Sequence, residues 1–318
     1  MNNLHVLRAR ISYDIIPKKD HGRKVVKLVR LFEIFTDSSS DITAKMIAGW
    51  RVTVIPLKVH LGNRTYNDDK DERELTYKEV FEKLRTDIPA STSALNIEDY
   101  KRELGPTLQK GKDILVVSFS SELSSTYANG YAAVNDLQEQ YPGQKIRIVD
   151  SKCVSLGLGL LLSKAVALAD EGKPIGEVEA FIRQTIPKVN HWFTVENLKR
   201  LRQGGRISAT SAALGGLLNI KPVLCVDDAG KLQAVAKARG RKSSIEALAS
   251  RVAERIVRPE EQTVFIAHGD CMGDVQVLVR KIKEKVPVKG FEINYVGPVI
   301  GAHTGAGLLA VFFLGEKR

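Results

Sequence analysis

Hydroxyl side chains gather in two short segments of this sequence, and a third segment places a histidine among glycines. The segments are Ser91–Ser93, Ser120–Thr126 and Gly297–Gly307, the last containing His303. In an open α/β sheet, ligands bind beyond the carboxyl ends of the strands, where hydroxyls and free N–H groups at helix N-termini favour an anion. If the three segments converge, they suit a carboxylate or phosphate group. Each segment alone also fits a plainer role, because serine and threonine before a helix commonly act as caps.

The sequence lacks the motifs of several common catalytic sites. It has no GxSxG nucleophile elbow, no GxxxxGK[ST] phosphate loop, no GxGxxG opening a βαβ unit and no HExxH pair. Gly157 and Gly159 do not have dinucleotide-binding spacing and fit close helix packing. A serine nucleophile needs an adjacent base. His303 has polar neighbours, but no acid is identified that would orient it.

A basic segment over residues 198–208 is different in kind. It reads as the basic end of a helix, a Gly204-Gly205 stop, and a capping Ser208 before a small-residue helix over 209–218. Its cations could bind phosphate or RNA. They could equally complement the dipole at a helix C-terminus. The sequence leaves both interpretations open.

Apolar runs indicate the elements that would position these segments. In the first half, strands are expected at residues 31–35, 52–59, 114–118 and 145–149, and helices at 76–85, from Tyr127 and after Ser155. Strands that alternate with helices predict a parallel sheet with helices on both faces. Beyond Pro174, shorter strands are expected at residues 191–195, 222–226, 232–236, 264–268 and 291–296, with a turn at 227–230. This second half is expected to form a mixed sheet with helices.

The chain therefore divides into three expected regions: a basic N-terminal extension over residues 1–30, an α/β domain over 31–155 and a second α/β domain over 156–318. The extension contributes +6 of the net charge of +11. We interpret it as a flexible tail or as sequence upstream of the true start, with a functional basic arm as the alternative. The body is only mildly basic and lacks the basic stripe with interleaved aromatics that nucleic-acid binding needs.

Composition points to an ordinary globular protein. Hydrophobic residues make up 43% and charged residues 27% of the 318 residues. No apolar run reaches the roughly 18 residues that a membrane-spanning helix needs, so no stable membrane insertion is expected. Three sparse cysteines, none in a CxxC pair or at metal spacing from a histidine, argue against zinc and disulfides and fit a reducing cytoplasm.

Taken as an ordered series, these segments resemble the DegV family of fatty-acid-binding proteins. The resemblance covers about residues 31–315. It is carried by TDSSSDI at 36–42, STS at 91–93, SSELSSTY at 120–127, DSKCVSLGLGLL at 150–161, LRQGGRIS at 201–208, NIKPVL at 219–224 and GPVIGAHTGAG at 297–307.

The resemblance implies two α/β domains that bury one long-chain fatty acid between and within them, in a carrier rather than an enzyme and with no other cofactor. It implies that the carboxylate meets side chains of the three segments, namely Thr92, Ser93, Ser120, Ser121 and His303. It further implies a partner kinase that converts the bound acid to an acyl-phosphate. The basic stretch at residues 237–242 would meet that kinase, and Arg239 is the residue expected to contact it.

Some positions depart from the family pattern. Ala94-Leu95 stands in place of Gln-Pro, Glu122 in place of Gly, and Ala306 in place of Gly. Glu122 adds an acid near the expected anion site, at a turn where Gly geometry is expected. The apolar tunnel could be lined in part by residues 156–162 and 214–220, although both runs also fit plain core helices.

Two other classes of function stay open on the sequence. An enzyme that acts on a small keto or phosphorylated metabolite could use His303 as a base or as a point of covalent attachment. The fold resembles that of dihydroxyacetone kinase subunits, which keeps this alternative in view. A nucleic-acid-binding protein would account for the positive charge alone. Lipid extracted from the purified protein and identified by mass spectrometry would separate these alternatives.

Overall fold

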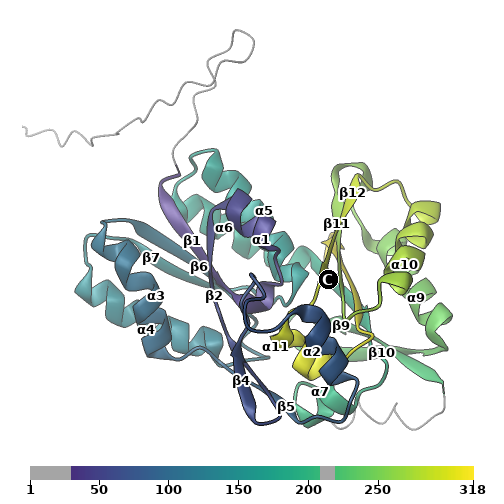
Figure 1. Cartoon of the computed structure of the whole chain (residues 1–318). Coiled ribbons are helices and arrows are strands. Elements are labelled where there is room, and N and C mark those ends of the chain that lie inside the picture. Colours follow the sequence, from purple (N-terminus) through teal and green to yellow (C-terminus); the bar gives the residue numbers. More distant parts are fainter. Residues whose placement is uncertain (1–29, 208–218) are drawn as a thin grey trace, which may run out of the picture.

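The computed structural model describes residues 30–207 and 219–318, and Figure 1 shows their arrangement. Three sheets form the frame of this part of the chain. Two expectations lie outside the described residues. One is the basic extension up to residue 29. The other is the helix at 209–218, with its capping Ser208 and most of the run at 214–220.

The first sheet is parallel throughout, with strand order β2-β1-β6-β7. Its strands are β1 (Phe32–Asp37), β2 (Val52–Ile55), β6 (Asp113–Ser118) and β7 (Ile146–Asp150). The apolar run at 114–118 is fully buried, as expected for a strand covered on both faces. The parallel sheet predicted for the first half is confirmed.

Five helices surround this sheet. They are α1 (Ala44–Trp50), α3 (Ile97–Gln109), α4 (Thr126–Gln140), α5 (Leu156–Asp170) and α6 (Ile175–Thr185). Helices α3 and α4 pack against each other and on β6, α5 packs on α6, and α1 packs on β2. The α5 run at 156–162 is buried all round, because this helix also packs on the large sheet of the second half.

The large sheet is mixed, with strand order β10-β9-β8-β13-β11-β12. Its strands are β8 (Val189–Thr194), β9 (Ile220–Val226), β10 (Leu232–Arg239), β11 (Thr263–His268), β12 (Gly290–Tyr295) and β13 (Leu309–Leu314). Only β11 and β12 pair in parallel. Helices α9 (Arg241–Arg255) and α10 (Met272–Lys285) cover one face over a separate apolar cluster. The predicted mixed sheet is confirmed.

The third sheet is small and antiparallel, with β3 (Lys58–Leu61) between β4 (Arg64–Asn67) and β5 (Ala90–Ser93). Helix α11 (Pro298–Thr304) packs on β3 and β5, and also on α2 (Tyr77–Leu84) and α7 (Lys199–Gln203). Three short 3-10 helices complete the described elements: η1 (Ser38–Ser40), η2 (Ile186–Lys188) and η3 (Pro259–Glu261). A C-terminal helix thus lies on a sheet built from the first half of the chain.

Local chemistry explains where several elements begin and end. The expected cap Thr76 opens α2 and forms a capping box with Glu79. The single strand expected at 52–59 is wrong. The chain leaves the first sheet after Ile55 and enters the small sheet at Lys58, because Pro56 between them has no N–H to extend a ladder.

The strands divide between the two halves of the chain. Every strand of the parallel and small sheets ends by Asp150, and every strand of the large sheet begins at Val189 or later. Helix α5 packs on β8, β11 and β13 of the large sheet and on α6. The domain boundary at residues 155–156 stays a prediction.

Candidate functional site

A cavity of about 250 Å³ lies among the small sheet, the large sheet and α11. Most of the side chains that line it are apolar. They come from β8, β9, β10, β13, α7 and α11 and from the segments beside β3, β5, β6, β13 and α5: Leu57, Ala94, Phe119, Leu123, Val154, Phe193, Leu201, Val226, Leu232, Val299, Ile300, Leu308, Ala310 and Phe312. The polar lining residues are Thr92, Ser93, Ser124, Ser125, Ser155, His191, Arg206, His303 and Thr304.

All three expected segments reach this cavity, and two of them are in direct contact there. Thr92 lies on β5 and His303 on α11, and Thr92 Oγ1 is 2.8 Å from His303 Nε2, within hydrogen-bond distance. The two residues are 211 positions apart in the chain. They meet because α11 packs directly on β5. Burial, followed by the charge of Arg206, lowers the pKa of His303 to about 4, so the ring is neutral at pH 7.

Ser93 also lines the cavity, and its hydroxyl contacts a histidine of the neighbouring strand. Ser93 Oγ is 2.8 Å from His60 Nε2, and His60 Nδ1 is 2.8 Å from Thr65 Oγ1. These contacts cross the small sheet from β4 through β3 to β5. Sequence reasoning missed His60 and Thr65, because neither belongs to a motif. The signal for them is the cross-strand register, which the sequence alone does not supply.

Arg206 supplies positive charge to the cavity. Of the described residues that line it, Arg206 is the one with a cationic side chain. Its guanidinium donates to the carbonyl of Leu123 over 3.1 Å and to the carbonyl of Gly204. Burial lowers the pKa of this guanidinium. The sequence left phosphate binding and a helix-dipole role open for this basic segment, and did not place Arg206 with His303.

Gly204 brings this segment against His303. A Cβ on Gly204 would lie 2.3 Å from His303 Nδ1, closer than real side-chain contacts allow. The backbone of Gly204 is right-handed helical, so the need for glycine here comes from the close approach alone. The next residue, Gly205, has a φ of +70° and open space around its Cβ position. The Gly-Gly stop thus combines a steric requirement with a conformational one.

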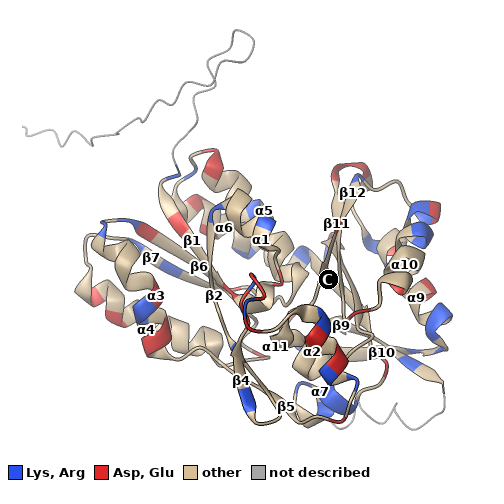
Figure 2. Ribbon diagram, in the orientation of Figure 1, with Lys and Arg blue, Asp and Glu red and all other residues tan. Residues whose placement is uncertain are grey.

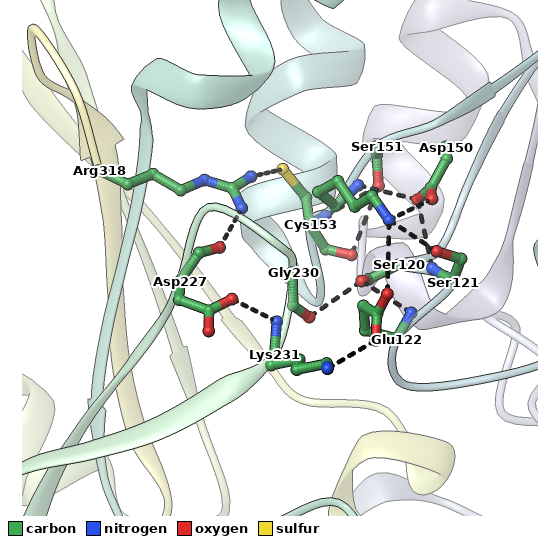
Figure 3. Close-up of polar contacts among 11 residues, drawn as sticks. Ser120, Ser121, Glu122, Asp150, Ser151, Cys153, Asp227, Gly230, Lys231 and Arg318 are labelled. Carbon is green, nitrogen blue, oxygen red and sulfur yellow. Dashed lines mark hydrogen bonds and ion pairs between the residues drawn. The ribbon is translucent and has the colours of Figure 1, made fainter.

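The second hydroxyl segment contributes differently from what the sequence suggested. Ser120 and Ser121 are not among the residues that line the cavity. Ser120 Oγ donates to the carbonyl of Gly230 over 2.9 Å, and Lys152 Nζ donates to Ser121 Oγ over 2.7 Å (Figure 3). The part of this segment that reaches the cavity is Leu123–Ser125.

Ser120 and Ser121 belong instead to an interface with the turn between β9 and β10. Figure 3 shows this turn, at Asp227–Gly230, facing the loops after β6 and β7. Glu122 lies 3.4 Å from Lys231 and 3.9 Å from Lys152, so its charge is shared between two lysines. Glu122 is also not among the residues with positive φ, so its turn does not need glycine.

The segment at residues 36–42 positions the site without lining it. Asp41 Oδ1 accepts from the Gly297 N–H over 2.8 Å, and Asp41 Oδ2 accepts from Ser155 Oγ over 2.6 Å. These bonds fix the starts of α11 and α5 against one loop. Lys70 lies 3.8 Å from Asp41 and 2.9 Å from Asp68, which compensates the buried acids.

Helix α5 is a core helix rather than a cavity wall. Residues 156–162, which were a candidate lining, are buried but do not line the cavity. The cavity reaches only Val154 and Ser155, just before the helix begins.

The basic stretch at residues 237–242 does not line the cavity. Arg239 is exposed at the end of β10, an edge strand of the large sheet. Figure 2 shows Lys and Arg residues along β10, α9 and α10. Arg241 is engaged, with Nε 2.9 Å from Asp274 and one nitrogen donating to the Gly307 carbonyl over 2.7 Å. Arg239 is therefore available to a partner, whereas Arg241 holds the loop after α11.

Metal-binding clusters and membrane-spanning helices are both absent from residues 30–207 and 219–318. Within these ranges, no three His, Cys, Asp or Glu side chains are grouped so that they could hold a metal ion. Among the helices of the same ranges, none has the length and apolar character to cross a membrane.

Comparison with known proteins gives consistent matches. Residues 31–316 match the family model of the DegV family. A DegV domain-containing protein of Clostridium perfringens is 44% identical over 290 residues, which cover 91% of this chain and 99% of that protein.

Solved structures show the same fold. A DegV family protein from Thermus thermophilus, described by its fatty acid binding, has a TM-score of 0.79 and 30% identity, covering 89% of this chain and 99% of that one. The Streptococcus pneumoniae Fatty Acid Kinase (Fak) B3 protein, loaded with linoleic acid, has a TM-score of 0.77 and 22% identity, covering 90% and 99%. At 22% identity, the similarity to the Streptococcus pneumoniae protein shows a shared fold alone.

Proposed function

The chain belongs to the DegV family, and from this premise we propose that it binds one long-chain fatty acid in the cavity, with the carboxylate against Thr92, Ser93, His303 and Arg206. The observation that carries the proposal is the cavity itself. Its walls are mostly apolar, and hydroxyls, a neutral histidine and one guanidinium converge on it. The Thermus thermophilus relative, described by its fatty acid binding, supports the choice of ligand.

The polar groups suit a carboxylate. A buried carboxylate needs several donors, because an unpaired buried charge costs far more than a lost neutral contact. If Thr65 donates to His60 Nδ1, then His60 Nε2–H donates to Ser93 Oγ, and the Ser93 hydrogen is free for the ligand. Arg206 adds a charge-assisted donor. Ser120 and Ser121 were also expected to meet the carboxylate, but of this segment Ser124 lines the cavity. The Ser124 hydroxyl accepts from the Thr126 N–H over 3.2 Å and lies 2.8 Å from Thr126 Oγ1.

The apolar walls suit an acyl chain. A C16–C18 acid buries some 15 methylenes, worth roughly 12 kcal/mol in gross at about 0.8 kcal/mol each. Ordering of the chain and loss of its free motion remove much of this gain. The remainder supports tight binding of a ligand that needs no covalent link to the protein.

Lipid analysis tests the proposal directly. The purified protein is extracted, and the lipid is identified and quantified by mass spectrometry against protein concentration. We expect about one long-chain fatty acid per chain. Protein that carries none, and that takes none up from albumin-delivered palmitate or oleate, would show that the cavity serves another ligand.

Replacement of Ser93 by alanine should weaken fatty-acid binding about tenfold, because one hydrogen bond to a charged group is worth roughly 1.4 kcal/mol or more. The protein should still fold, since the change leaves little void. Displacement of a fluorescent fatty acid measures the affinity. Ser91→Ala is the matched control, because Ser91 is exposed on the same strand and does not line the cavity. Equal affinities for the two variants would remove Ser93 from the site.

We further propose that the protein presents the bound carboxylate to a partner kinase, which phosphorylates it to an acyl-phosphate. The Streptococcus pneumoniae protein of the same fold is named Fatty Acid Kinase (Fak) B3, and this name motivates the proposal. The exposed Arg239 at the edge of the large sheet suits contact with a partner. The kinase proposal depends on fatty-acid binding, whereas fatty-acid binding does not depend on the kinase. A failed kinase assay would therefore leave the binding proposal standing.

Arg239→Ala should leave the fatty-acid content unchanged and abolish acyl-phosphate formation in the presence of the kinase. The reason is that Arg239 is exposed and does not line the cavity. The assay follows phosphate transfer from radiolabelled ATP to bound oleate. Lys112→Ala, an exposed change outside the basic stretch and the cavity, is the control for a general loss of charge. Loss of bound lipid in Arg239→Ala would contradict the assignment.

A further inference from the structure

A second cavity, of about 340 Å³, adjoins the first. The two cavities share two lining residues, His191 and Val226. His191 lies on β8 and is 1% exposed, and Val226 is the last residue of β9 and is 2% exposed. These two side chains therefore form the wall between the cavities.

The course of β13 shows which end of the first cavity this wall closes. Leu308, Ala310 and Phe312 line the cavity at alternate positions, as residues on one face of a strand do. The strand leads away from α11, which carries His303, and Phe312 pairs with His191 in the neighbouring strand. Four residues of strand span about 13 Å. An acyl chain whose carboxylate lies at His303 and which follows β13 ends against His191.

The wall stands where the large sheet opens. Strands β8 and β9 pair at Trp192–Cys225, Phe193–Leu224 and Thr194–Val223, and the pairing ends before His191 and Val226. The last residue, Arg318, bridges the opening, donating to the carbonyl of Val189 over 3.1 Å and to that of Asp227 over 2.8 Å. His191 and Val226, which line both cavities, thus lie where β8 and β9 separate.

His191 is held firmly in this place. Its Nδ1 donates to the Val189 carbonyl over 3.0 Å, and its Nε2 accepts a longer bond, of 3.4 Å, from the Val154 N–H. A Cβ on Gly157 would lie 2.1 Å from Nε2, so the ring is packed against the start of α5. Burial, with the nearby charge of Arg318, lowers the pKa of His191 well below its usual value. The ring is therefore neutral and both nitrogens are satisfied, as suits contact with a hydrocarbon end.

The second cavity has a mixed lining. Charged side chains line it together with an apolar part, which Trp192, Val226 and Val235 form. Trp192 gives it an apolar wall, and the guanidinium carbons of Arg251 and Arg255 lie 5.0 Å and 5.2 Å from the centre of that ring. The stems of these arginines add apolar surface beside the ring. An acyl chain that passed the wall could contact the Trp192 ring.

We propose that His191, together with Val226, sets the upper limit on the length of the acyl chain by closing the tail end of the cavity. The inference rests on the proposed fatty-acid binding and names the part of the protein that selects among fatty acids. His191 acts by filling space rather than by touching the carboxylate. Its removal should therefore change which chains bind, not whether the head group is recognised.

The test compares wild type, His191→Ala and Val226→Ala in competition with an equimolar series of saturated acids from C14 to C22, read by native mass spectrometry of the complexes. Each wall variant should raise the ratio of bound C20 acid to bound C16 acid about tenfold. This increase corresponds to burial of two of the four additional methylenes, because two methylenes are worth roughly one decade of affinity. Cys225→Ala is the control. It enlarges only the second cavity and leaves the wall intact, so its ratio should match wild type.

The outcomes separate the two proposals. A wild type that binds the series, with both wall variants keeping its chain-length ratio, would overturn the role of His191 and leave fatty-acid binding standing. A wild type that takes up no member of the series would overturn both. His191→Ala removes partners from two backbone groups, so thermal unfolding is measured for every variant. If His191→Ala does not fold, Val226→Ala decides, because it removes only apolar atoms.

Discussion

Arg206→Ala should weaken fatty-acid binding by roughly 10- to 100-fold, the largest loss we expect from a single side chain in the cavity. Of the described lining residues, Arg206 is the one with a cationic side chain. A hydrogen bond to a charged group contributes about 1.5–3 kcal/mol, and loss of the cation would also leave the carboxylate buried without a counter-charge. Titration with a fluorescent fatty acid measures the change.

The control for this prediction lies in the same segment. Arg202 is exposed on α7 and does not line the cavity, so Arg202→Ala removes an equal charge without touching the ligand. We expect wild-type affinity for that variant. If both variants lose affinity equally, the effect would come from the general positive field of the segment. If neither does, the carboxylate does not lie against Arg206.

The hydroxyl segments illustrate what the sequence can and cannot locate. The strand at 114–118 could be predicted because a strand buried on both faces is a continuous apolar run. The end of β6 was therefore placed correctly, and with it the loop that begins at Phe119. The sequence could not say which hydroxyls of this loop face inward. Ser120 bonds to the Gly230 carbonyl, whereas Ser124 lines the cavity, and the place of Ser120 depends on how the β9–β10 turn packs on the loop.

The residues that were missed share a physical reason. His60 acts on Ser93 across two strands, and Arg206 approaches His303 across about a hundred residues of chain. Neither relation leaves a local pattern, since both depend on how separate elements pack. Pro56 is different, because its missing N–H is visible in the sequence and marks the break between β2 and β3. The single strand expected at residues 52–59 is therefore wrong for a local reason, because Pro56 already signals the break.

Gly204 and Gly205, which precede Arg206, allow the effect of a steric clash to be separated from the effect of backbone strain. Gly204→Ala should weaken fatty-acid binding at least about tenfold and destabilise the protein by about 1–3 kcal/mol. A Cβ there would lie 2.3 Å from His303 Nδ1, whereas the backbone of Gly204, at φ −75°, accepts alanine without strain. The ring must move, and the bond between His303 Nε2 and Thr92 Oγ1 should be lost with it.

Gly205→Ala is the matched control, because it has the opposite properties. Its φ of +70° strains any L-residue, but no atom lies within 4 Å of the added Cβ. It should lower the melting temperature, since a non-glycine residue in this conformation costs about 1–2 kcal/mol, and leave the affinity of the folded protein near wild type. Thermal unfolding and fatty-acid titration on both variants give the comparison. Equal affinities for the two variants would mean that the position of His303 does not matter for the ligand, and His303 would then leave the proposed head-group site.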